Sequence, residues 1–336
     1  MNLKTIAELA GVSTATVSNV VNGNFGKVSE ETRKRVETII RENDYRPSLM
    51  ARSLARKQSQ IIGLVLPYIE PDQDLLTSLY YAYIVAALER VVRNEDYYLM
   101  LRCVGEVREI IPYLRAWNVD GAFFVGVFEE EAEKIREQFD APAVFLDTYA
   151  EKGNIVNVGI DDYRGGYLSA RYLLGRGHRQ IALATPDYTK PGVIRERFRG
   201  FSDACREAGA PFSEKDVFLT ETHYQSGISA AQDIVFSGRG YTAAAAMADV
   251  VAIGMLEGLR QCGLSLPQDL SVIGFDNVPE CAFVTPRLTT IEQDVKAKAE
   301  RAGEYIFRMI RGEKDLTADL RLPIRIVERD SVARIG

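Results

Sequence analysis

Residues 5–23 read TIAELAGVSTATVSNVVNG, and this stretch decides the fold of the first part of the chain. Thr5 and Glu8 have the spacing of a capping box, which predicts that a helix begins at Thr5. Gly11 is placed to end that helix in the left-handed conformation, and Ser13 is placed to cap a second helix directly afterwards. The apolar stripe expected on the first helix is Ile6, Leu9 and Ala10. The pattern predicts a helix, a tight glycine turn and a second helix.

A third helix is expected after the break at residues 22–24. Ser29 is its expected N-cap, and Glu30 and Glu31 are favourably placed against its dipole. The inward positions are Val17, Val20 and Val21 on the second helix and Val36, Ile39 and Ile40 on the third. Three short helices that share apolar faces predict a small all-α head.

The outward face of the second helix carries only small or hydrogen-bonding side chains. Its exposed positions are Ser13, Thr14, Ala15, Thr16, Ser18 and Asn19. Such a face can approach DNA closely, with its N-terminal amides near phosphate and its side chains near base edges. Packing of two helices across a three-residue turn, without any DNA, is the alternative interpretation.

Charge is distributed unevenly along the chain. Residues 1–60 hold ten Lys and Arg against six Asp and Glu, whereas the remainder holds 31 against 41. A basic head on an acidic body predicts that the head is the part that meets a polyanion.

The overall composition is that of a globular protein. The chain has 336 residues, 46% of them hydrophobic and 26% charged, which excludes a disordered or fibrous protein and predicts two or three domains. No apolar run approaches the ~18 residues of a membrane span. The N-terminal MNLKTIAELAGVS lacks the apolar core of a signal peptide, so we expect a cytoplasmic protein with no membrane partner.

Neither enzymatic chemistry nor a cofactor or metal is expected. Four cysteines stand far apart with no C-x-x-C pair and are expected to be buried free thiols: Cys103, Cys205, Cys262 and Cys281. No G-x-G-x-x-G follows an expected strand, and no G-x-x-x-x-G-K-[ST] occurs. The two histidines have no converging acid, base and nucleophile beside them, and His178 is expected to be structural.

From residue 61 onward, apolar runs alternate with amphipathic segments. The expected strands are 61–66, 98–104, 119–127, 143–146, 181–184, 217–219, 242–247 and 271–275. Continuous apolar strands separated by helices predict parallel sheets covered on both faces, and the length of this body predicts two lobes. The expected fold class is α/β, with an all-α head followed by two doubly wound lobes.

The head and the segment after it resemble the LacI/GalR family of bacterial transcription regulators. The resemblance runs through TIAELAGVSTATVSNVVNG and continues in VSEETRKRVETIIRENDYRPSLMARSLARKQSQIIGLVLP. It implies a homodimer that binds a pseudopalindromic operator, with Thr14, Ala15 and Asn19 at base-reading positions. The further DNA-binding residues expected on the head are Thr5, Ser13, Thr16 and Ser18.

Residues 46–56, RPSLMARSLAR, form a segment that is marginal as an isolated helix because helix nucleation is costly. A flexible basic linker is the plain interpretation. The family resemblance implies instead a hinge helix in the DNA minor groove, with Leu54 wedged into a base step and Arg52, Ala55 and Arg56 at the DNA. The expected domains are 1–46 for DNA binding, 47–60 for the hinge and 61–336 for effector binding and dimerisation. Within the last, the N-lobe is about 61–160 and 293–320, and the C-lobe about 161–292 and 321–336.

Asp147 and Asp276 each follow an apolar strand, where α/β lobes bind ligands, although a turn or cap role is the alternative. The body resembles the family's effector domain, which has a periplasmic-binding-protein-like fold of type I. The matching segments are NVGIDDYRGG, LLGRGHRQIAL, RFRGF, LPQDLSVIGFDN and LTTIEQD. The resemblance implies that Asp276 and Arg197 grip a small effector, expected to be a sugar or sugar derivative. The further expected effector contacts are Tyr68, Asp147 and Asp249.

The sequence leaves the ligand and the mode of control open. Ala248 stands where the family usually has an asparagine, which removes an amide from the expected site. Control by a phosphoprotein corepressor, control by a nucleobase, and a transport-associated sugar-binding role are the alternative functions. Tyr80, Tyr81 and Tyr83 are expected either to stack on a sugar ring or to pack the first helix of the body, and Trp117 is expected in the core.

Overall fold

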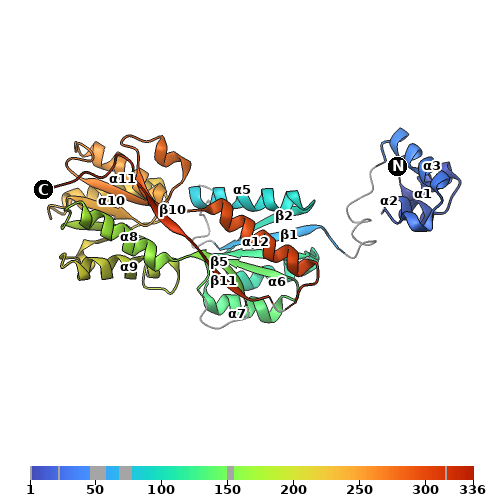
Figure 1. Cartoon of the computed structure of the whole chain (residues 1–336), viewed down its shortest axis with the longest axis horizontal. Coiled ribbons are helices and arrows are strands. Elements are labelled where there is room, and N and C mark those ends of the chain that lie inside the picture. The colour runs from blue at the N-terminus through green and yellow to red at the C-terminus, as the bar shows by residue number, and fades with distance from the viewer. Residues whose placement is uncertain (1, 22, 46–57, 68–77, 150–154, 315) are drawn as a thin grey trace. The chain divides into compact units, whose positions relative to one another are not determined.

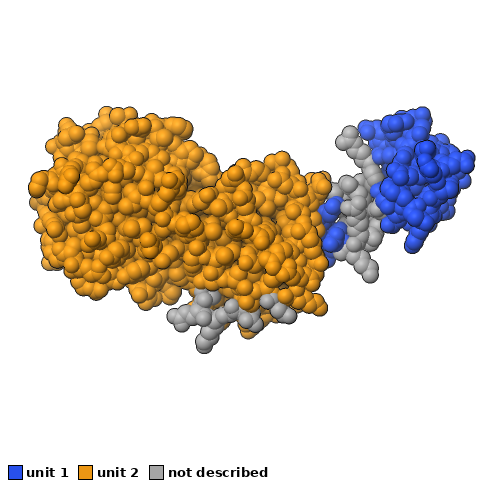
Figure 2. Space-filling view, viewed as in Figure 1, with its two compact units in different colours: residues 1–61, 113–120 blue, residues 62–112, 121–336 orange. Residues whose placement is uncertain are grey.

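The computed structural model describes residues 2–21, 23–45, 58–67, 78–149, 155–314 and 316–336 (Figure 1). The chain forms two compact units, residues 1–61 with 113–120 and residues 62–112 with 121–336 (Figure 2). Five of the residues predicted to contact ligands lie outside the described residues: Arg52, Leu54, Ala55, Arg56 and Tyr68.

The head contains the three predicted helices, together with one short 3-10 turn. Its elements are α1 (Leu3–Ala10), α2 (Thr14–Val21), η1 (Phe25–Lys27) and α3 (Glu30–Glu42). The buried apolar side chains of the described head residues are Ile6, Ala7, Ala10, Val17, Val20 and Val36. One small apolar core therefore holds the three helices together.

The caps that the sequence predicts for the second and third helices are present. The Ser13 hydroxyl accepts from the Thr16 amide at 3.1 Å, and the Ser29 hydroxyl accepts from the Thr32 amide at 3.3 Å. Gly11 ends α1 at φ 64°, in the left-handed region where glycine has no steric penalty. Local sequence signals therefore set these three helix ends.

The predicted start of the first helix is wrong. α1 begins at Leu3, and Asn2 is its N-cap, because the Asn2 side-chain oxygen accepts from the Thr5 amide at 3.0 Å and from the Thr5 hydroxyl at 3.1 Å. An asparagine three residues before Thr5 already satisfies that amide, so the Thr-x-x-Glu pattern lies inside the helix. Leu9 was also misplaced, since it is 55% exposed while Ala7 is buried.

The body contains two six-stranded sheets, as Figure 1 shows. The first has the order β11-β5-β4-β3-β1-β2, and the second has the order β12-β10-β9-β8-β6-β7. The first sheet is built from β1 (Ile61–Pro67), β2 (Tyr98–Val104), β3 (Gly121–Val125), β4 (Ala143–Leu146), β5 (Val156–Ile160) and β11 (Ala318–Leu322). The second is built from β6 (Ile181–Thr185), β7 (Val217–Leu219), β8 (Ala243–Ala246), β9 (Ser271–Asp276), β10 (Thr289–Gln293) and β12 (Ile324–Val327).

The pairs β1–β3, β3–β4, β4–β5 and β5–β11 of the first sheet and β7–β6, β6–β8, β8–β9 and β9–β10 of the second are parallel, whereas β12 pairs antiparallel with β10. The eight predicted strands are all present, with ends that shift by at most two residues. The prediction missed β5, β10, β11 and β12, which contain polar residues or alternate between exposed and partly buried positions and so lack a continuous apolar run.

Helices cover both faces of the two sheets. Those of the first lobe are α5 (Leu79–Asn94), η3 (Val107–Ile110), α6 (Ile111–Ala116), α7 (Glu129–Gln138) and α12 (Val295–Ile310). Those of the second lobe are α8 (Asp162–Gly175), α9 (Val193–Glu207), η4 (Glu214–Asp216), α10 (Tyr224–Phe236), α11 (Asp249–Gln261) and η5 (Pro279–Ala282). In Figure 1, α8 and α9 lie on one side of the second sheet, and α10 and α11 on the other.

The chain passes between the lobes three times. It crosses after β5 into α8, after β10 into α12, and after β11 into β12. Residues that are far apart in sequence therefore meet where the two sheets approach each other.

Two glycines set the spacing of the helix pair that carries Arg197. A Cβ on Gly166 of α8 would lie 1.8 Å from the Arg197 carbonyl oxygen, and a Cβ on Gly200 of α9 would lie 1.8 Å from the Tyr163 carbonyl oxygen. Only glycine permits this approach of two helix backbones. The close packing brings the side chain of Arg197 to the first residue of α8, Asp162.

The structure also tests the expectations for His178, Trp117 and the four cysteines. His178 is buried and structural, because its ring nitrogens lie 3.0 Å from the Thr242 hydroxyl and 3.2 Å from the Ala333 carbonyl oxygen, and burial lowers its pKa. Trp117 was expected in the core but is 60% exposed. The four cysteines are free thiols, as predicted, but only Cys205 and Cys281 are buried, whereas Cys103 and Cys262 are partly exposed. Among the described helices, none is long and apolar enough to cross a membrane.

Candidate functional site

Asp147 and Asp276 stand at equivalent places in the two lobes. Asp147 follows β4 of the first sheet directly, and Asp276 is the last residue of β9 of the second. Both have left-handed backbones, with φ 56° and 128°, and Asn277 follows at φ 60°. Such conformations are costly for residues other than glycine and persist where the surrounding structure holds them, which is common at ligand sites.

Lys298 holds the side chain of Asp147 in the first lobe. The Lys298 ammonium, which has no exposed surface, lies 2.6 Å from Asp147 Oδ1 and 3.0 Å from the Tyr80 hydroxyl. Tyr80 donates to the other oxygen, Asp147 Oδ2. Burial and the Asp147 charge raise the pKa of Tyr80, so this phenol stays a donor at neutral pH.

Arg197 holds Asp162 in the second lobe. The Arg197 Nε donates to Asp162 Oδ1 at 2.7 Å, and Nη1 donates to the Met247 carbonyl oxygen at 2.8 Å. The guanidinium lies over the Phe275 ring with its carbon 3.7 Å from the centroid, and Tyr149 donates to Asp162 Oδ2 at 2.8 Å. Burial lowers the pKa of Arg197, but Asp162 and Asp276 together raise it above its ordinary value.

Gln293 connects the two halves of this buried cluster. Its amide oxygen accepts from Lys298 Nζ at 2.7 Å, and its amide nitrogen donates to Asp276 Oδ1 at 2.5 Å. Arg197 Nη1 lies 4.0 Å from the same Asp276 oxygen. The structure thus brings together three predicted residues, Asp147, Arg197 and Asp276, from both lobes.

Burial dominates the electrostatics of Asp276. Removal from water raises its pKa to about 7, although Arg197, Gln293 and Lys298 each lower it. Burial also raises the pKa of Asp162 despite its ion pair with Arg197. Each oxygen of Asp147 and Asp162 accepts a hydrogen bond from the protein, whereas the described hydrogen bond of Asp276 uses only Oδ1, so Asp276 has acceptor capacity left for a ligand.

Asp249, a further predicted effector contact, lies in the wall behind Asp276. It is fully buried, and its oxygens accept from the Thr290 hydroxyl at 2.6 Å, the Val278 amide at 3.0 Å and the Cys281 thiol at 3.0 Å. Burial raises the pKa of Asp249. Its contacts in this structure join α11 to β10 and to the segment after β9.

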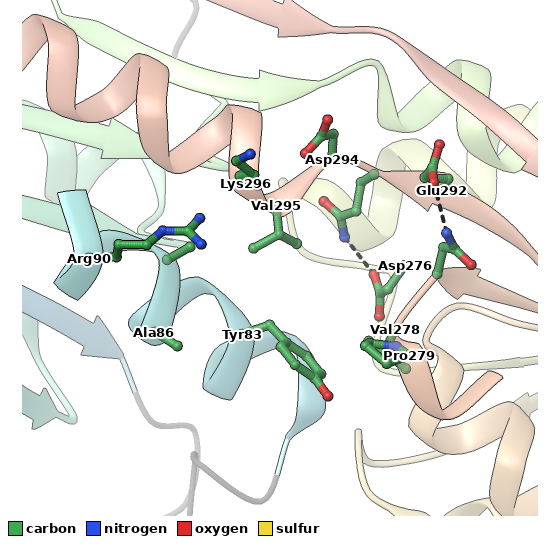
Figure 3. A pocket seen from close by; sticks show the side chains of 13 residues that line it. Tyr83, Ala86, Arg90, Asp276, Val278, Pro279, Glu292, Asp294, Val295 and Lys296 are labelled. Carbon is green, nitrogen blue, oxygen red and sulfur yellow. Dashed lines mark hydrogen bonds between the residues drawn. The ribbon is translucent and has the colours of Figure 1, made fainter. Parts of the chain in front are cut away.

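A pocket of about 450 Å³ opens beside Asp276 (Figure 3). Helix α5 contributes Tyr83, Ala86, Ala87 and Arg90, and the remaining walls come from residues 276–279 and 292–296. The Tyr83 hydroxyl donates to Glu280 Oε1 at 2.9 Å, which links α5 of the first lobe to η5 of the second. The three predicted tyrosines therefore make contacts within the body, since the Tyr80 and Tyr81 rings also form a tilted pair with centroids 5.7 Å apart.

The predicted DNA-facing surface of the head is partly open to solvent. Ser13, Thr14 and Ala15 are exposed, while Thr16, Ser18, Asn19 and Thr5 are partly buried. The Ser13 hydroxyl is 2.9 Å from the Thr16 hydroxyl and caps α2, so these two side chains order the N-terminus of the helix. Thr14, Ala15 and Asn19 remain on the outer side of the small core.

Sequence reasoning missed four members of the buried cluster: Tyr149, Asp162, Gln293 and Lys298. Lys298 carries a readable signal, because it stands four residues before Ala302 and eight before Ile306, both fully buried, on one stripe of α12. A lysine at a core position of an amphipathic helix needs a buried partner. Asp147 is that partner.

Comparisons with known proteins agree with this architecture. Residues 2–48 match the family described as bacterial regulatory proteins, lacI family, and residues 170–332 match the periplasmic binding protein-like domain. The repressor PurR of Erwinia tasmaniensis is 31% identical, over 98% of this chain and 96% of the relative.

Two solved structures are also similar. The lac repressor dimer bound to operator and the anti-inducer ONPF has a TM-score of 0.85 at 25% identity, over 99% of each chain. The CelR–cellobiose complex has a TM-score of 0.73 at 25% identity, over 98% of this chain and 99% of the other.

A helix-turn-helix head joined to a two-lobed binding fold defines the class of DNA-binding transcription regulators. The chain belongs to the lacI family of bacterial regulatory proteins. It is a DNA-binding transcription repressor and not an enzyme.

Proposed function

We propose that this repressor is controlled by a neutral, polyhydroxylated small molecule, a sugar or sugar derivative, bound between the lobes by Asp276, Arg197 and Asp147. The observation that carries the proposal is the excess of acceptors in the buried cluster. Three carboxylates share two cations, and the hydrogen bond that Asp276 accepts within the described residues uses only Oδ1. Several ligand hydroxyls would supply the missing donors.

Arg197 provides the complementary donors. A guanidinium has five N–H groups, and its described hydrogen bonds to Asp162 and Met247 use two of them. The oxygens of the ligand hydroxyls accept hydrogen bonds from the remaining N–H groups of Arg197, and the same hydroxyls donate hydrogen bonds to Asp276. The CelR–cellobiose complex supports the sugar class, as a similar fold with a sugar bound. Asp249 then supports the site from behind, because its oxygens already have protein donors.

A nucleobase is the second candidate effector. Ala248 removes an amide that the family usually places in this site, so the pose of a sugar differs from the usual one. A planar base also offers both donors and acceptors to Asp276 and Arg197. Control by a phosphoprotein is the third candidate, and it requires no ligand between the lobes.

For the DNA side, we infer a homodimer on a pseudopalindromic operator. Thr14, Ala15 and Asn19 read base edges, and Thr5, Ser13, Thr16 and Ser18 line the same surface. Leu54 enters a central base step, and Arg52, Ala55 and Arg56 lie at the DNA. The effector acts by preferring one arrangement of the lobes, which changes the spacing of the paired hinge segments.

A thermal-shift screen followed by calorimetry tests this proposal. Cellobiose, ribose, hypoxanthine and guanine are titrated into the full chain, and each ligand that binds is measured again with operator DNA present. Stabilisation by a sugar, with an affinity that changes when operator is added, is the expected result. Binding of a base alone would replace the sugar, and stabilisation by neither class would favour the phosphoprotein.

A further inference from the structure

Lys298 uses all three of its N–H donors inside the protein. Its ammonium contacts Asp147 Oδ1 at 2.6 Å, Gln293 Oε1 at 2.7 Å and the Tyr80 hydroxyl at 3.0 Å. An ammonium has three donors and no acceptor. The lysine is therefore saturated and lies behind the effector site, with no donor left for a ligand.

A donor-only neighbour decides which way the Gln293 amide points. The two ends of a glutamine amide are nearly identical in shape but opposite in hydrogen bonding, since one end accepts and the other donates. Lys298 requires the oxygen, so the NH₂ group must point away, towards Asp276 Oδ1 at 2.5 Å. Figure 3 shows this hydrogen bond at the edge of the pocket.

We propose that Lys298 is a positioning residue of the effector site, which acts through Gln293 to fix the carboxylate of Asp276 and to leave its second oxygen for the ligand. The proposal rests on the proposed function, because it assigns Asp276 to the ligand. Lys298 also connects the two lobes. It contacts Asp147 of the first lobe directly, and it reaches Asp276 of the second lobe through Gln293.

Several charged and polar groups around Asp276, Lys298 among them, affect the pKa of its carboxyl group. Arg197 of α9 and Lys298 of α12 are the cations that face it, Gln293 of β10 donates to it, and Asp249 of α11 repels it. The phenols Tyr80 and Tyr81 of α5 also lie near enough to interact with its charge. Both the charge of Lys298 and the hydrogen bond of Gln293 lower the pKa of Asp276.

The test is an NMR titration of the Asp276 carboxyl carbon in the full-length chain labelled with ¹³C-aspartate. The Asp276→Asn variant identifies the signal. In Lys298→Met the pKa of Asp276 is expected to rise by about one unit or more, because a cation and an ordered donor are lost together. Lys134→Met, which removes an exposed lysine on α7, is the matched control and leaves the titration unchanged.

A double variant separates the effect of Lys298 on the orientation of Gln293 from the effect of its charge. Lys298→Met with Asp147→Asn removes one charge of each sign, so it keeps the net charge of the cluster and avoids an unpaired buried ion. The freed Gln293 amide still loses its anchor, and a rise of about half a unit is expected to remain. Circular dichroism confirms that each variant is folded.

The outcomes decide the proposal without any effector. A wild-type titration of Asp276 in the double variant would overturn the positioning role and leave Lys298 a charge partner of Asp147. An unchanged titration in Lys298→Met would overturn it outright. A screen that finds no sugar would remove the proposed effector class but leave these titrations as expected, so the two failures are distinguishable.

Discussion

The two carboxylates at the strand ends of the lobes have the same local setting and different partners. Asp147 has a lysine at 2.6 Å and a phenol on its other oxygen. Asp276 has its nearest cation at 4.0 Å and accepts its described hydrogen bond from a neutral amide. The same pattern, an apolar strand followed by an aspartate, thus gives one residue with a protein donor on each oxygen and one with a described donor on a single oxygen, so Asp276 has more acceptor capacity left for a ligand.

The largest expected effect comes from removing Lys298, the cation that pairs with Asp147. Lys298→Ala leaves the Asp147 carboxylate buried without its cation, which is expected to lower the free energy of unfolding by about 3–5 kcal/mol. Urea denaturation at pH 7 measures it. The Lys298→Met and Asp147→Asn double variant should recover most of the loss, and equal stability of Lys298→Ala and wild type would show that the pair is not buried.

Asp276, whose nearest cation is 4.0 Å away, is expected to make the free energy of unfolding depend on pH. Burial raises the pKa of Asp276 to about 7, above the value of roughly 3.9 in an unfolded chain. Its contribution to stability is therefore fully present below about pH 4 and is lost as the pH rises through about 7.

Between pH 5 and pH 8, the wild type is expected to lose about 3 kcal/mol more unfolding free energy than Asp276→Asn. Urea denaturation of both proteins at the two pH values measures the difference. His178 is present in both proteins and lies outside this cluster, whereas Asp249 interacts with Asp276, so the difference contains the titration of Asp276 and its coupling to Asp249. Identical slopes in the two proteins would place Asp276 in water.

Effector affinity is the next effect in size. Asp276→Ala removes an acceptor from a buried site, which is expected to cost about 1–3 kcal/mol of effector binding while operator binding without effector persists. Calorimetry with the sugar found in the screen measures the loss, and the melting temperature is recorded beside it. A variant that melts lower but binds the sugar normally would make Asp276 a structural residue.

The smallest expected effect concerns the hinge. If Leu54 enters a base step, Leu54→Ala is expected to lose operator bending and at least ~1 kcal/mol of operator affinity. Gel-shift titration and a bending assay on the operator measure both quantities. Unchanged bending and affinity would mean that residues 47–60 only link the two parts of the chain. That outcome would not bear on the roles of Asp147 and Asp276.

The sequence predicted the head and the α/β body well because their signals are local. Ser13 and Ser29 cap helices where expected, and continuous apolar runs marked the buried parallel strands. The first cap failed because Asn2 competed for the amide of Thr5. Strands such as β11 and β12 were missed because an edge position requires no continuous apolar run.

The candidate site was only half predictable. Asp147 and Asp276 could be found from their places after strands, and Arg197 came from the family resemblance. Lys298 and Gln293 could not be connected to them, because the contact of Lys298 with Asp147 spans 151 positions and depends on where the chain crosses between lobes. Whether Asp249 faces a ligand or the protein was likewise decided by tertiary packing alone.

In the proposed function, a ligand held by Asp276 between the lobes controls DNA binding. The most direct measurement is calorimetric titration of the effector sugar into wild type and Asp276→Asn, each with and without operator DNA. We expect operator to change the sugar affinity of the wild type. Asp276→Asn is expected to bind operator normally but to show weak sugar binding and no effect of sugar on operator affinity. Sugar binding by the wild type that operator leaves unchanged would contradict it.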